Sequence, residues 1–226
     1  MRLRKTLFLG SLALCIYTAA DAASCEAVSA VSRAPAQAQT DSKPPAIAAR
    51  PIPDVKVIDQ DGNARHFYTD LVKGKVVVVN FIYTTCTTIC PPLGATFGKL
   101  QKGLGDRLGK EVFLISISVD PATDTPSRLR AWGAQFGATH GWTLVTGDKG
   151  ELNRLLRVLG TDVASPENHS AMVLIVNDKA GTWKRVYGLG STSALMRSVE
   201  QMLSAAAADS SKSSGSALGD RQRDPQ

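Results

Sequence analysis

The sequence has few of the residues that define specialised classes of chain. It contains four cysteines and three histidines in 226 residues, and its aromatic content is 6%. Four cysteines are too few for a small disulfide-scaffold protein, and three histidines exclude a histidine-rich metal store. The 43% hydrophobic content is too high for a wholly disordered chain. The composition therefore indicates an ordinary globular chain, with one domain of about 150 residues plus terminal extensions.

The sequence also lacks any run of five or six like charges, although its formal net charge is +6. Part of that excess comes from Arg2, Arg4 and Lys5 at the amino terminus. Proteins that bind nucleic acids usually carry a basic stripe, often with interleaved aromatic residues. Because the charges here are scattered, we expect no nucleic-acid partner.

The amino terminus has no apolar run long enough to span a membrane. Thr6–Ala20 is uncharged and mostly apolar, but a spanning helix needs about 20 residues. A basic start precedes this run and small residues follow it, which is typical of a secretory signal peptide over residues 1–22. Alternatively, residues 22–25 resemble a bacterial lipobox, in which Cys25 would be acylated and would attach the chain to a membrane. Both alternatives place the mature chain in the periplasm or at the extracytoplasmic face of the bacterial inner membrane.

Two segments offer nothing to bury in a core. Residues 23–50 are rich in Ala, Ser, Pro and Gln and are predicted to form a flexible tether. Residues 205–226 consist mainly of Ala, Ser, Gly and charged residues and are predicted to be a disordered tail. The segment between them, residues 51–204, is long enough for a single domain with a sizeable core.

Hydrophobic periodicity predicts alternating strands and helices in that domain. An amino-terminal hairpin (55–58 and 65–68) is expected around Asp61-Gly62, the strongest turn signal. Strand–helix–strand crossovers require parallel pairing, and a later hairpin adds antiparallel strands. The predicted fold is α/β and thioredoxin-like, a mixed central sheet flanked by helices with an amino-terminal β-hairpin extension. Further strands are expected at 75–83, 111–119, 142–145, 171–177 and 183–187, and helices at 91–108, 125–136, 150–159 and 191–204.

A pair of cysteines follows the most apolar strand directly. Cys86 and Cys90 precede Pro91-Pro92, which suit the first turn of a helix. Both sulfurs therefore lie at a helix amino terminus, where the helix dipole favours a thiolate. Such a pair can exchange electrons with a partner through a disulfide, bind one soft cation, or form a permanent structural disulfide. The last stabilises little, because so short a loop removes little chain entropy.

A metal ion would need a third ligand, and the predicted topology selects one histidine. Structural zinc normally takes four protein ligands, whereas Cu(I) accepts fewer and prefers thiolate and imidazole. If strand 171–177 pairs antiparallel with strand 75–83, His169 arrives at the edge of the sheet where the cysteines lie. His66 is expected in the hairpin as a partly exposed strand residue, and His140 in a solvated loop.

Two aspartates follow the next parallel strand. Asp120 is expected at the cysteine edge, either near the site as an acceptor for a ligand or as the start of a loop. Asp124 directly precedes Thr125-Pro126, which read as a helix cap and first position. We therefore attribute Asp124 to helix-start chemistry.

These spaced motifs resemble the Sco/SenC family over about residues 47–204. The resemblance is carried by residues 81–91 (FIYTTCTTICP), 116–121 (SISVDP) with 124–126 (DTP), and 168–170 (NHS). The family consists of thioredoxin-like, membrane-associated copper proteins that help assemble the binuclear copper centre of cytochrome c oxidase. Carried over, the copper ligands are Cys86, Cys90 and His169. Thr87 departs from the family, which often has proline after the first cysteine, and many members keep a transmembrane helix.

The resemblance implies a copper-binding assembly factor rather than a turnover enzyme. The cysteine pair and His169 would hold Cu(I) or Cu(II) and pass it to the copper-bearing oxidase subunit, with another copper chaperone or a thiol reductant as a further partner. The first alternative is a periplasmic thiol–disulfide oxidoreductase that uses the redox-active pair Cys86 and Cys90. The second is a peroxiredoxin-like peroxidase with either sulfur as the attacking thiolate. The motif by itself does not decide between copper delivery, thiol reduction and redox sensing.

Overall fold

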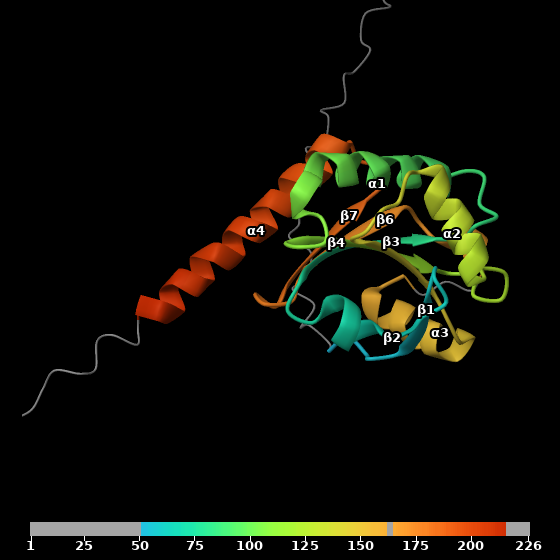
Figure 1. Cartoon of the computed structure of the whole chain (residues 1–226), viewed down its shortest axis with the longest axis horizontal. Helices are drawn as coiled ribbons and strands as arrows, with labels where there is room; N and C mark the ends of the chain where they lie inside the picture. The colour runs from blue at the N-terminus through green and yellow to red at the C-terminus, as the bar shows by residue number, and fades with distance from the viewer. Residues whose placement is uncertain (1–50, 162–164, 216–226) are drawn as a thin grey trace, which may run out of the picture. The chain divides into compact units, whose positions relative to one another are not determined.

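A run of β-branched residues forms the central strand. In the computed structural model, which describes residues 51–161 and 165–215 (side chains to residue 204), strand β3 (Val76–Ile82) is buried at every position. Branched side chains favour the extended backbone, and an uninterrupted apolar run suits a strand covered on both faces. Strand β3 lies within a seven-stranded sheet of order β2-β1-β5-β4-β3-β6-β7 (Figure 1).

The sheet is mixed, as predicted. Strand β3 pairs parallel with β4 (Val112–Ser118) and antiparallel with β6 (Met172–Asn177). Strand β5 (Trp142–Thr146) continues the parallel part beside β4. The carboxyl ends of β3 and β4 and the beginning of β6 therefore meet at one edge of the sheet. The remaining strands are β1 (Lys56–Asp59), β2 (Ala64–His66) and β7 (Thr182–Tyr187).

Helices cover both faces of the sheet and create two cores. Val78 and Ile82 of β3 face the core formed with α1 (Cys90–Leu104), α2 (Pro126–Gln135) and α4 (Thr192–Gly215). Val77, Val79 and Phe81 face the other core, formed with α3 (Lys149–Leu159) and the π-helix η1 (Phe67–Val72). Alternation along the strand produces this division, because successive side chains point to opposite faces. The predicted thioredoxin-like arrangement is confirmed.

The amino-terminal hairpin differs from its prediction in its second strand. Strand β2 ends at His66, and the predicted strand residues Phe67 and Tyr68 instead begin η1. The carboxylate of Asp54 accepts hydrogen bonds from the backbone N–H groups of Tyr68 and Thr69, at 2.9 and 3.0 Å, and from the Thr69 hydroxyl at 2.6 Å. Because a carboxylate satisfies the first free N–H groups of a helical turn, it favours the turn over the strand.

The last helix is longer than predicted. Helix α4 continues to Gly215 instead of ending near Ser204, so it includes half of the segment predicted as a disordered tail. Residues 205–208 are all alanine, the residue with the highest helix propensity. The predicted signal peptide (1–22), the tether (23–50), Cys25 and residues 216–226 lie outside the described residues. No helix in the described ranges has both the length and the apolar character needed to cross a membrane.

Candidate metal centre

The two cysteines lie where β3 passes into α1. Cys86 follows the strand after a turn in which its N–H donates to the carbonyl of Tyr83, at 3.2 Å. Cys90 is the first residue of α1, and its N–H donates to the sulfur of Cys86 at 3.4 Å. The residue before the helix, Ile89, offers no side-chain cap. The sulfur of Cys86 therefore accepts one of the helix's otherwise free N–H groups.

Both cysteines are free thiols, and their acidities differ strongly. Burial alone would raise the pKa of Cys86. Hydrogen bonds from the Cys90 thiol, from backbone N–H groups and from Thr88 outweigh burial and lower that pKa to about 7. Burial, together with the hydrogen bond to Cys86, raises the pKa of Cys90 to about 12. Near neutral pH, Cys86 is therefore about half thiolate, whereas Cys90 stays a thiol that donates a hydrogen bond to it.

This asymmetry predicts selective alkylation of the reduced, metal-free chain. The rate of iodoacetamide addition to Cys86 should rise as the pH increases through about 7, because the thiolate is the nucleophile. Cys90, which is 0% exposed, should react much later. Peptide mass mapping against pH measures both rates, and Cys90→Ala serves as a control because the loss of its thiol should move the Cys86 profile to higher pH. A first adduct on Cys90 would contradict the prediction.

His169 reaches the cysteines from the loop that precedes β6. It follows a 3₁₀ turn, η3 (Pro166–Asn168), and is 4% exposed. Its Nδ1 lies 2.7 Å from the carbonyl oxygen of Pro166, and its Nε2 lies 3.9 Å from the sulfur of Cys90. A carbonyl only accepts, so Nδ1 carries a proton and donates it. In the neutral ring, the lone pair of Nε2 then points toward the sulfur, the orientation of a metal-ligating imidazole.

Tyr83 closes one side of this group. Its ring meets the ring of His169 edge to face, with centroids 5.5 Å apart and planes at 75°. Burial, followed by a hydrogen bond with Cys86, raises the pKa of the Tyr83 phenol to about 12. The phenol therefore stays neutral at physiological pH and adds no charge beside the sulfurs.

Asp124 has a role that the sequence did not reveal. Thr125 caps α2 as predicted, accepting from the N–H of Arg128, whereas the Asp124 carboxylate bonds to residues outside that helix. Asp124 is 1% exposed, and one carboxylate oxygen accepts from the N–H and the hydroxyl of Thr84, at 3.0 and 2.6 Å. Its other oxygen accepts from the hydroxyl of Ser118 at 2.6 Å. Asp124 thus ties the loop before Cys86 to the end of β4.

In the described part of the chain, no hydrogen bond or ion pair joins the other candidates to the sulfurs. Asp120 closes the loop after β4 through its backbone carbonyl, which accepts from Thr123 and Asp124, and no described hydrogen bond joins its carboxylate to the three predicted ligands. His66 is exposed in β2, with Nδ1 3.8 Å from Asp54. His140 is exposed in the loop before β5. Both lie where the sequence predicted.

The donor atoms fit a soft cation in part. Metal–sulfur and metal–imidazole bonds measure about 2.3 and 2.0 Å, and their sum exceeds the 3.9 Å between Cys90 and His169, so one ion can bond to both. Within the described residues, no three Cys, His, Asp or Glu side chains are already arranged to hold an ion. A three-ligand site therefore needs at least one of the three side chains to move.

Comparison with known proteins identifies similar chains. Residues 48–204 match the SCO1/SenC family model. A SCO1 protein homolog of Bacillus subtilis is 38% identical over 90 residues, which cover 39% of this chain and 45% of that protein. A protein of Stutzerimonas stutzeri, whose name proposes that it binds copper, is 32% identical over 111 residues, covering 49% and 52%. The matches thus span about half the length of these relatives.

Solved structures share the fold over most of their length. A SCO1/SenC family lipoprotein of Bacillus anthracis has a TM-score of 0.57 and 29% identity, covering 65% of this chain and 91% of that one. BsSco, described as a member of the Sco family of cytochrome c oxidase assembly proteins, has a TM-score of 0.57 and 27% identity, covering 68% and 93%. Copper-bound ScoI of Bradyrhizobium japonicum, at 22% identity, shares the fold with a TM-score of 0.54, covering 66% and 96%.

Proposed function

The chain belongs to the SCO1/SenC family, and from that premise we propose that it is a copper chaperone for the assembly of the binuclear copper centre of cytochrome c oxidase. Reduced Cys86 and Cys90 bind copper as Cu(I) or Cu(II), and His169 completes the site. The observation that carries the proposal is the 3.9 Å approach of the His169 Nε2 to the Cys90 sulfur. Two thiolates and an imidazole match the ligand preference of copper.

The surroundings of the site support cargo binding more than a permanent disulfide. The Pro166 carbonyl fixes the His169 ring with Nε2 toward the sulfur, an outer-shell contact of the kind that orients metal-ligating histidines. The low pKa of Cys86 favours the thiolate that a metal requires. The ion is cargo, transferred by ligand exchange to the copper-bearing oxidase subunit, so the chain needs no turnover chemistry of its own.

We place this activity outside the cytoplasm, where a secreted copper chaperone would meet the oxidase. The apolar amino-terminal run and Cys25 in its lipobox-like context support export, with residues 1–22 as the signal peptide. The similarity to a Bacillus anthracis protein described as a lipoprotein supports the same location.

The experiment that tests the proposal combines metal analysis with absorption spectroscopy. The reduced chain should bind about one copper with thiolate-to-metal absorption, and His169→Ala should weaken binding roughly a hundredfold or more, because each ligand of a protein metal site contributes several kcal/mol. His140→Ala, a histidine in an exposed loop, is the matched control and should bind as the wild type does. A stoichiometry well below one, or equal affinity in both variants, would overturn the proposal.

The second candidate function is a thiol–disulfide oxidoreductase. The specific observation in its favour is the pair of unequal thiols, with Cys86 acidic and Cys90 held as a buried thiol, because a low-pKa thiolate attacks disulfides and a second thiol resolves the mixed disulfide. This function predicts insulin or partner reduction that tolerates His169→Ala. The same variant therefore separates the two functions.

A further inference from the structure

A cavity of about 560 Å³ lies beside β5, away from the cysteines. Strand β1 pairs with β5 at only two positions, Ile58 with Thr146 and Asp59 with Val145. The first half of β5 therefore pairs with β4 on one side and with no described strand on the other. There the side-chain carbonyl of Gln60 accepts the N–H of Leu144, at 2.8 Å, in place of a backbone partner. The cavity thus lies where the chain turns away from β5 after Asp59, the last residue of β1.

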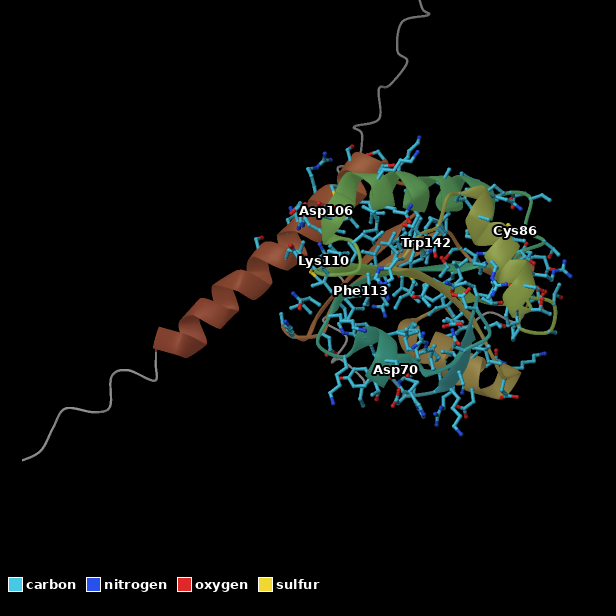
Figure 2. All side chains as sticks on the ribbon, viewed as in Figure 1. Asp70, Cys86, Asp106, Lys110, Phe113 and Trp142 are labelled. Atoms are coloured by element: carbon cyan, nitrogen blue, oxygen red, sulfur yellow. The ribbon has the colours of Figure 1, made fainter. Side chains whose placement is uncertain are left out.

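This cavity is separate from the candidate metal centre. Its lining includes Phe113, near the beginning of β4, and Trp142, the first residue of β5. Cys86 lies beyond the opposite end of the parallel strands, and Figure 2 shows Cys86 and Phe113 well apart. A ligand in the cavity would therefore not touch the sulfurs.

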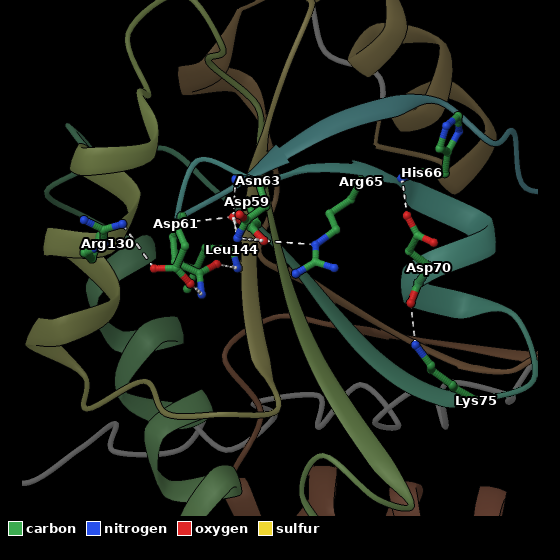
Figure 3. A network of polar contacts seen from close by, with 10 residues as sticks. Asp59, Asp61, Asn63, Arg65, His66, Asp70, Lys75, Arg130 and Leu144 are labelled. Carbon is green, nitrogen blue, oxygen red and sulfur yellow. Dashed lines mark hydrogen bonds and ion pairs between the residues drawn. The ribbon is translucent and has the colours of Figure 1, made fainter.

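Arg65 presents unused donors to the cavity. Its Nε donates to the buried carboxylate of Asp59 at 3.1 Å. Asp59 is otherwise occupied inside the hairpin, where it accepts from the N–H of Asp61 and from the backbone and side chain of Asn63. Within residues 51–161 and 165–215, no hydrogen bond engages the two terminal nitrogens of Arg65. Asp59 therefore orients the guanidinium and leaves its outer side available (Figure 3).

Lys75 is a second cation in the same cavity, and it has no carboxylate partner among the described ion pairs. Its ammonium donates to the backbone carbonyl of Asp70 and lies 4.8 Å from the centroid of the Phe113 ring. The Asp70 carboxylate is turned to the N–H of His66, at 2.7 Å. Burial lowers the pKa of Lys75, and the nearby charge of Arg65 lowers it further, against the opposing effect of Asp70. Arg65 and Lys75 are thus two positive charges that line the same cavity and do not share a carboxylate partner among the described ion pairs (Figure 3).

We propose that this cavity binds a small oxyanion, a carboxylate or a phosphate, between Arg65 and Lys75. A guanidinium with two free terminal nitrogens matches the paired oxygens of such groups, and the ammonium supplies a second positive charge. Phe113 and Leu71 give the cavity an apolar wall, which suits an anion attached to a ring or a short hydrocarbon. Arg130, whose Nη2 is 3.1 Å from Asp61, stands elsewhere along the lining as a further cation.

The test is an amide NMR titration of the full chain with inorganic phosphate and, separately, with benzoate, each against chloride at equal ionic strength. Saturable shifts are expected at residues 143–144 and near Lys75 with at least one probe. Lys75→Gln and Arg65→Gln should each weaken binding roughly tenfold or more, because hydrogen bonds to charged groups are strong. Arg128→Gln, an exposed arginine of α2 outside the lining, is the control and should bind normally.

The two probes distinguish the kinds of anion. Tighter binding of benzoate would identify a carboxylate with an apolar body, and tighter binding of phosphate would identify a phosphoryl group. The proposal is overturned if neither probe gives a saturable shift, if the shifts map to another surface, or if Lys75→Gln binds as tightly as the wild type. Lys75→Gln is the decisive variant because, unlike Arg65→Gln, it leaves the buried Asp59 with its partner.

Discussion

Serine in place of Cys86 or Cys90 is expected to abolish tight copper binding by the reduced chain. A protein metal site with four ligands binds zinc with about 10–16 kcal/mol, so each ligand is worth roughly 2.5–4 kcal/mol, or about two to three orders of magnitude in affinity. Copper prefers thiolate sulfur even more strongly. The substitution changes one atom in a buried position, since Cys86 is 6% and Cys90 0% exposed, so the fold should survive.

Copper affinity is measured by competition with a chelator of known strength, and circular dichroism confirms folding. Cys25→Ser is the matched control, because it removes a cysteine of the amino-terminal segment and should leave copper binding unchanged. If either single serine variant kept the wild-type affinity, the pair could not act together as copper ligands.

Among all the proposed substitutions, Asp124→Ala should cause the largest loss in the free energy of unfolding. The substitution leaves the N–H and hydroxyl of Thr84 and the hydroxyl of Ser118 without their acceptor. An unpaired buried donor costs about 1–3 kcal/mol, so we expect a total loss of about 3–5 kcal/mol for the three donors together. Such a loss lowers the melting temperature by roughly 10 °C in a domain of this size. Asp124→Asn should lose less, because its amide oxygen can still accept from Thr84.

Asp120→Asn provides the control for this experiment. Asp120 lies in the same loop, but its carboxylate makes no described hydrogen bond, so the change should stay within about 0.5 kcal/mol. Urea unfolding monitored by tryptophan fluorescence measures all three variants. If the free energy of unfolding of Asp124→Ala were within about 1 kcal/mol of the wild-type value, the network would stabilise the loop far less than its contacts indicate.

The sheet was predictable because its strands carry strong local patterns. The apolar runs ending at Tyr83 and Val119 specify buried strands, and the crossover rules then determine their order and direction. The same topology brought His169 to the cysteine edge, 79 positions from Cys90 in the sequence. Long apolar strands and the geometry of connections thus carry information about a distant ligand.

The features that escaped prediction depend on contacts between segments. Phe67 and Tyr68 have strong β propensity, whereas the Asp54 carboxylate, 14 residues from Tyr68, accepts hydrogen bonds that favour a helical turn. Asp124 precedes a helix in sequence, yet its partner Thr84 is 40 residues away. Neither contact leaves a mark in the local pattern. The unequal acidities of Cys86 and Cys90 likewise depend on burial, which spacing alone does not reveal.

The division of the site between distant parts of the chain has a consequence for its mechanics. Cys90 begins α1, whereas His169 ends the connection from α3 to β6, 79 positions later. A cation bonded to both would cross-link a long closed loop, and only the native state could offer it both atoms at once. The loaded molecule would then resist proteolysis better than the empty one, and delivery of the cargo would release the start of α1 from the loop before β6.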